Sequence, residues 1–170
     1  MSDSLFAQTL SVIFRELIQG SPDPGTRTYV LNQGDQGLLA SLDRLSAEAA
    51  SARHDGGASI AAHVDHLRYG FSLLNRWGDG LSPPWPAMDW TESWRRNVVS
   101  EDGWKTLREE FRRETARWVE VLNQRREVSE NEAGWIAVSV IHLAYHLGAI
   151  RQIDRSLRGP TAEDEARARG

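Results

Sequence analysis

Cysteine is absent from the 170 residues of this chain. Its absence excludes disulfide bonds, thiolate metal sites and cysteine nucleophiles, so any metal site has to be built from His, Asp or Glu. The net charge of -4 is small and provides no basic surface for nucleic acids or anionic membranes. No run approaches the roughly 18 consecutive apolar residues that a membrane span requires. We therefore expect neither nucleic acid nor a membrane as a partner.

Sequence motifs of several enzyme classes are also missing. The chain has no glycine-rich phosphate loop, no Gly-x-Ser-x-Gly elbow and no His-Glu-x-x-His of zinc proteases. Its start, Met1-Ser2-Asp3-Ser4, lacks the basic and then apolar pattern of a signal peptide, from which we expect a cytoplasmic protein. Its length and the lack of internal repeats predict one domain over residues 1–160, followed by a charged, frayed tail at 161–170.

Apolar residues recur at three- and four-residue spacing in five segments, which predicts an all-α protein. The expected helices span about 3–19, 35–50, 59–77, 103–124 and 132–158. Ser59 is the expected N-cap of the third helix, and Ser46 is expected to start a fresh turn within the second. The last four helices form an expected four-helix bundle with a core at about 35–158, and the first is an extra helix packed outside it.

Tryptophan is unusually frequent, with seven residues in the chain. Trp104 and Trp118 lie in the apolar stripe of an expected helix and are predicted core residues. Trp85, Trp90 and Trp94 cluster in and after a long proline-rich loop at about 78–90, and Thr91 is expected to start a short turn through Trp94. Two interpretations of this cluster stay open: the rings close the end of the bundle, or they anchor an interface.

Four of the five histidines lie in apolar helices, whereas His54 lies in a glycine-rich break and is expected to be exposed. His142 and His146 are one helical turn apart on one face, where two imidazoles can hold one metal ion. Either His63 or His66 would complete a set of three histidines that leaves coordination positions open. An all-nitrogen shell suits Zn, Ni, Fe or Cu, and it does not suit Ca or Mg.

A family resemblance is carried by two segments, Ser59-Ile60-Ala61-Ala62-His63-Val64-Asp65-His66-Leu67 and His142-x-x-x-His146-x-Gly148-x-Ile150. They resemble the second and fourth bundle helices of the DinB/YfiT-like superfamily, in a register that covers roughly residues 35–157. The resemblance implies a four-helix bundle with up-down-down-up topology that binds one divalent metal ion. Position by position, it implies His66, His142 and His146 as the ligands. The chain departs from the family at Ala149, where the family often has Gln.

The resemblance also implies an activity on a small-molecule substrate. Better-understood members of the superfamily are transferases or isomerases that use a low-molecular-weight thiol such as bacillithiol or mycothiol, which a metal ion (here Zn, Ni or Fe) activates. Hydrolysis is the other reaction expected of such a site.

Further residues around this implied site receive roles from their positions. His63 and Asp65 are candidates for proton transfer or for orienting an imidazole, and Asp65 is expected to face solvent. Trp135, Ser139 and Ala149 are candidates for lining the pocket. No catalytic residue is assigned.

A non-catalytic function is the alternative interpretation. The histidines would then be vestigial core residues, and the tryptophan loop and bundle faces would act through a partner or as a homodimer. The first helix would be a dimer element or a lid over the pocket. Tyr145, which lies between His142 and His146 in sequence, is expected to pack against a neighbouring helix.

Overall fold

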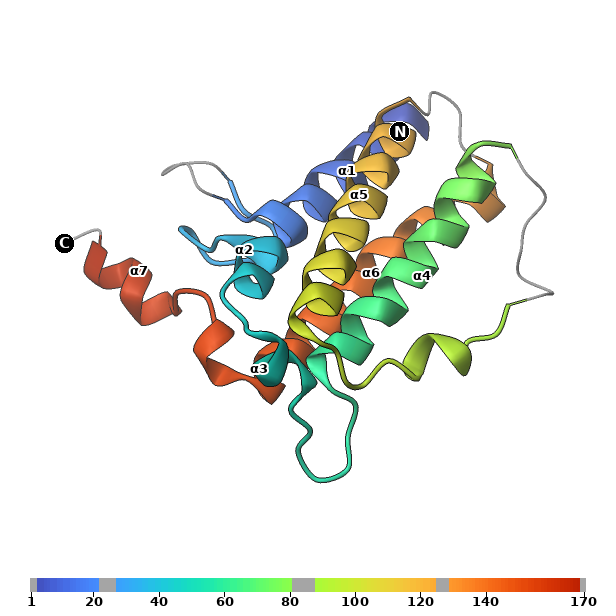
Figure 1. Cartoon of the computed structure of the whole chain (residues 1–170). Coiled ribbons are helices and arrows are strands. Elements are labelled where there is room, and N and C mark those ends of the chain that lie inside the picture. Colours follow the sequence, from blue (N-terminus) through green and yellow to red (C-terminus); the bar gives the residue numbers. More distant parts are fainter. Residues whose placement is uncertain (1–2, 22–26, 81–87, 125–128, 169–170) are drawn as a thin grey trace. The chain divides into compact units, whose positions relative to one another are not determined.

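The computed structural model describes residues 3–21, 27–80, 88–124 and 129–168, and these contain helices, turns and loops but no β-strand. The predicted all-α class is therefore confirmed. Contacts within the chain divide it into unit 1, Met1–Arg44 with Glu127–Gly170, and unit 2, Leu45–Arg126. Each unit is built on one pair of long helices, α1 with α6 in unit 1 and α4 with α5 in unit 2 (Figure 1).

Unit 1 pairs α1 (Asp3–Gln19) with α6 (Glu130–Ile153), and α2 (Gly37–Asp43) packs against α1. The helical period of α1 places its large apolar residues on one face, and Ala7, Phe14 and Leu17 are fully buried. The N-terminal helix thus spans the predicted residues. It packs against α6 within the unit, and its predicted place outside a four-helix bundle stays a prediction.

The segment that follows α1 is folded back by a buried carboxylate. Glu16 accepts hydrogen bonds from the backbone N–H groups of Tyr29, Val30 and Leu31 at 2.9, 2.8 and 2.7 Å. Gly20 makes the turn possible, because its φ is +78° and a Cβ there would lie 2.0 Å from the backbone oxygen of Asp35. One side chain and one glycine therefore shape a segment that has no helical or strand period of its own.

The C-terminal part of unit 1 begins with a capping box. The Ser129 hydroxyl accepts the backbone N–H of Glu132, whose carboxylate accepts the backbone N–H of Ser129. α6 then runs to Ile153, short of the predicted end at about 158. The short helices η3 (Arg155–Leu157) and α7 (Ala162–Ala168) follow, so the tail that was predicted to be frayed contains a helix.

Unit 2 pairs α4 (Ile60–Gly78) with α5 (Glu101–Gln124), and η2 (Glu92–Trp94) packs on α4. The predicted cap is confirmed, since the Ser59 hydroxyl accepts the backbone N–H of Ala62 at 3.2 Å. The predicted short turn ending at Trp94 is also confirmed as η2. Trp104 and Trp118 are 1% and 0% exposed, as predicted for core residues.

The helix predicted at 35–50 is two short helices, α2 and α3 (Ala47–Ser51), and the first belongs to unit 1 whereas the second belongs to unit 2. The break follows Asp43, and Ser46 starts the new helix by accepting the backbone N–H of Ala49 at 3.1 Å. The prediction of a single helix is therefore wrong, while the fresh turn expected at Ser46 is confirmed. Trp85 lies outside the described residues.

Candidate metal centre

Two histidine side chains of α6 turn the same ring nitrogen toward each other. The Nε2 atoms of His142 and His146 lie 2.8 Å apart, and the ring centroids lie 4.5 Å apart. At a metal–nitrogen bond length of about 2.05 Å, two adjacent ligands would be separated by about 2.9 Å in octahedral geometry and by about 3.3 Å in tetrahedral geometry. The separation in this pair is therefore close to that of two adjacent ligands of one octahedral metal ion and somewhat shorter than that of a tetrahedral one.

Burial favours the neutral form of His142, which is the form that metals require. His146 is 1% exposed and His142 is half-buried. Desolvation lowers the pKa of His142 below its ordinary value, because burial penalises the charged imidazolium. His142 is thus neutral at pH 7, with a lone pair for a metal ion.

His66 of α4 is held by a serine from η2. Its Nδ1 lies 2.8 Å from the Ser93 hydroxyl, and that hydroxyl donates to the Trp90 carbonyl at 2.7 Å. A hydroxyl has one hydrogen, so Ser93 must accept from the Nδ1–H of His66. We therefore assign the tautomer that carries its lone pair on Nε2. A hydrogen-bond partner on one ring nitrogen is the usual support of a histidine that binds metal through the other.

Two tryptophans fix the plane of the same ring. Trp94 stacks on His66 with centroids 4.2 Å apart and an interplanar angle of 22°, and Trp90 is tilted against it at 5.3 Å. His63 is half-buried, its ring is nearly perpendicular to that of Trp94 at a centroid distance of 5.2 Å, and burial lowers its pKa. Trp90 and Trp94 therefore pack on histidines of their own unit. In the sequence, Trp90, Ser93 and Trp94 lie along one turn. This spacing did not identify Ser93 as a hydrogen-bond partner of His66.

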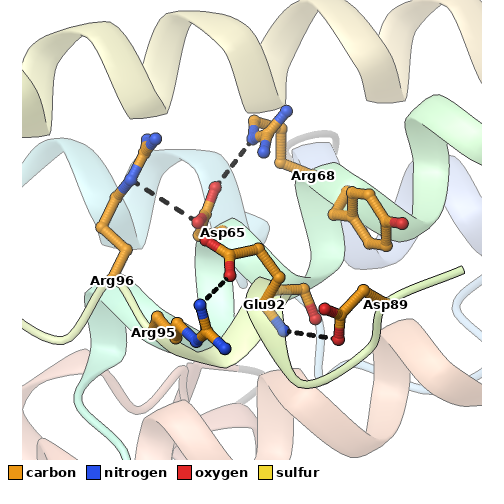
Figure 2. Close-up of a pocket in the computed structure, with 8 residues that line it drawn as sticks. Asp65, Arg68, Asp89, Glu92, Arg95 and Arg96 are labelled. Atoms are coloured by element: carbon orange, nitrogen blue, oxygen red, sulfur yellow. Dashed lines mark hydrogen bonds and ion pairs between the residues drawn. The ribbon is translucent and has the colours of Figure 1, made fainter.

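Ion pairs within and between α4 and the segment around η2 surround a pocket of about 390 Å³ (Figure 2). Asp65 is 5% exposed, so the prediction that it faces solvent is wrong. Its carboxylate pairs with Arg68 Nε at 2.8 Å and with Arg96 Nε at 3.5 Å, and Arg95 pairs with Glu92. Two guanidinium groups offset the cost of burying Asp65. Its pair with Arg96 ties α4 to the segment that follows η2, and the described structure gives it no imidazole partner.

The predicted pocket-lining residues share one face of α6 with His142 and His146. By the helical period, Trp135, Ser139 and Ala149 lie within a narrow sector around the two histidines. Ser139 is buried, and its hydroxyl donates to the backbone oxygen of Ile136 at 2.7 Å. Their shared face agrees with the predicted role, which itself stays a prediction.

Two further predictions concern single side chains. His54 is exposed, as expected of its glycine-rich break. Tyr145 is 70% exposed, so the prediction that it packs against a neighbouring helix is wrong. Its ring instead lies nearly perpendicular to that of His146, at a centroid distance of 5.1 Å.

Among the described residues, His142 and His146 belong to unit 1 and His66 belongs to unit 2. They are the three residues that the family resemblance implies as ligands. Comparisons of the chain with protein-family models, with curated proteins and with solved structures give no match. Membership of the DinB/YfiT-like superfamily therefore stays a prediction.

Proposed function

We propose that this chain binds one divalent transition-metal ion through His66, His142 and His146. The observation that carries the proposal is the 2.8 Å separation of the Nε2 atoms of His142 and His146. The hydrogen bond that His66 Nδ1 donates to the Ser93 hydroxyl supports the third ligand, because it leaves the lone pair on Nε2. Three neutral imidazoles favour Zn, Ni or Fe over the hard ions Ca and Mg.

The proposed scaffold is a four-helix bundle of the DinB/YfiT-like type with up-down-down-up topology. Its support is the presence of four long helices that pack as two pairs, α1 with α6 and α4 with α5. In this arrangement α1 is one of the four bundle helices, and the segment at 35–50 is a connection.

The reaction we propose is transfer involving a low-molecular-weight thiol, or else hydrolysis, of a small-molecule substrate. A divalent ion lowers the pKa of a thiol or water and so supplies the nucleophile at neutral pH. The chain has no cysteine, so the thiol comes from a second substrate. His63 is the candidate to accept a proton, since burial lowers its pKa and keeps it neutral at pH 7.

A non-catalytic module that self-associates, with vestigial histidines, is the second candidate function. The observation that favours it is the exposure of three large apolar residues on α6, namely Val138, Ile141 and Tyr145.

Elemental analysis of protein made without a histidine tag tests the metal proposal. After loading with Zn²⁺ and removal of excess metal, we expect about one ion per chain. His66→Ala, His142→Ala and His146→Ala should each lose it while circular dichroism stays helical. The matched control is His54→Ala, which changes an exposed histidine. Wild-type protein that retains no metal, or ligand variants that retain as much as the wild type, would refute the proposal.

A further inference from the structure

One face of α6 is apolar and exposed. Val138, Ile141 and Tyr145 are 49%, 66% and 70% exposed, and their spacing places them on one side of the helix. Gly134 and Gly148 continue this face and are exposed as well. Contiguous apolar patches are uncommon on monomeric proteins and mark interaction surfaces. We call these five residues the α6 stripe.

Among the described residues, no atom packs closely against the two glycines of the α6 stripe. A glycine inside a helix costs about 1 kcal/mol relative to alanine. A Cβ at Gly134 or Gly148 would meet no atom of the other described residues within 4 Å, so their packing does not require glycine at either position. The close approach of a second helix does require small residues. The glycines therefore suggest that another backbone lies against this face.

We propose that the occupant is a second copy of the chain, packed antiparallel across a two-fold axis near Ile141. The stripe has nearly the same order in both directions, with Gly at each end, a large residue next to each Gly and Ile141 in the centre. In this arrangement Gly134 meets Gly148 of the second copy and Val138 meets its Tyr145, whereas Ile141 meets its own equivalent. Such self-complementarity is what a two-fold interface demands.

The charges at the ends of α6 favour the same arrangement. Glu130 is exposed at the start of the helix, and Arg155 is exposed just beyond its end. Antiparallel pairing places the acidic start of one copy beside the basic end of the other, and it also opposes the helix dipoles. The α6 stripe itself contains no charged residue.

The alternative occupant of this face is a lipid bilayer. Among the described residues, α6 is the one helix long and apolar enough to cross a membrane, which is weak support because core helices pass the same test. The stripe extends for about 21 Å along the helix, which is short for a permanent interface. We therefore infer a reversible dimer with a dissociation constant in the micromolar range.

Sedimentation velocity on the full chain, with a chelator present, tests the dimer independently of the metal proposal. The wild type should change from monomer to dimer as its concentration rises through the micromolar range. Ile141→Lys should weaken the dimer at least tenfold, while Val98→Lys, which changes a 77% exposed valine outside the stripe, should not. Gly148→Ala should raise the melting temperature of the monomer and weaken the dimer.

Cross-linking tests the proposed two-fold axis. Because the chain has no cysteine, Ile141→Cys introduces a single thiol beside its own equivalent, and mild oxidation should join two chains by a disulfide. Val98→Cys should not be joined under the same conditions. A monomer at every concentration, a dimer insensitive to Ile141→Lys, or binding of the monomer to phospholipid vesicles through this face would overturn the proposal.

Discussion

The hydroxyl of Ser93 decides how His66 presents its ring, because it accepts the Nδ1 hydrogen at 2.8 Å. Ser93→Ala removes this bond and lets the imidazole change tautomer or rotate. We expect the affinity for Zn²⁺ to fall by about 10–100-fold, the usual effect of losing such a support. A competition titration with a chromophoric chelator measures it.

Ser72→Ala is the matched control for Ser93→Ala, because the Ser72 hydroxyl also donates to a backbone carbonyl and does so on α4. Its zinc affinity should equal that of the wild type. Equal affinities in Ser93→Ala and the wild type would show that this hydrogen bond does not support a ligand.

His63 should make the stability of the fold depend on pH. Burial lowers its pKa, so the folded chain binds this proton less readily than the unfolded chain does. The contribution of His63 to the free energy of unfolding is then fully present above about pH 6.5, and it is lost as the pH falls through the pKa of His63 in the folded chain.

His63→Gln should therefore lose less stability than the wild type between about pH 7.5 and 5.5. Urea denaturation of the metal-free protein at both pH values measures the difference. The exposed His54 provides the control, since His54→Gln should lose as much as the wild type. The same loss in His63→Gln as in the wild type would contradict the prediction.

At the scale of elements, Glu16 of α1 organises the segment that follows it. Its carboxylate is 7% exposed and accepts three backbone N–H groups. Glu16→Gln weakens these charged hydrogen bonds and turns an amide donor toward the N–H groups. We expect a loss of about 2–3 kcal/mol in the free energy of unfolding, measured by urea denaturation. Glu48→Gln, on an exposed carboxylate, should change it by less than about 0.5 kcal/mol.

The accuracy of the predicted elements depended on the source of their stability. The predicted bounds of α1, α4 and α5 are close to the observed bounds, because each helix carries an apolar stripe at the helical period. The prediction of one helix at 35–50 was wrong because the leucines of this segment belong to two packing environments. Some lie in α2 of unit 1, and the last lies at the start of unit 2. The segment around Tyr29 had no period because a side chain of another element holds it.

At the scale of the whole molecule, the proposed metal ion links α6 to α4 chemically, since α6 supplies two ligands and α4 supplies one. An ion that binds only the folded chain stabilises it by about 2.7 kcal/mol at a free concentration of 100 times the dissociation constant. For a chain of this size we expect the melting temperature to rise by about 5–10 °C.

Differential scanning calorimetry with and without Zn²⁺ measures this rise. His142→Ala should show no rise, because one of the two adjacent ligands on α6 is gone. A wild type that does not respond to Zn²⁺, or a His142→Ala variant that responds equally, would contradict the prediction.

The sequence by itself determined the features that follow from the local geometry of the backbone. The all-α class, the burial of Trp104 and Trp118, and the placement of His142 and His146 on one face all follow from a period of 3.6 residues. Only the tertiary structure decided the surroundings of His66 and Asp65, because Ser93, Trp94 and Arg96 reach α4 from a segment far along the chain. Contacts between distant segments depend on how the chain folds back on itself, and no spacing within a single helix encodes them.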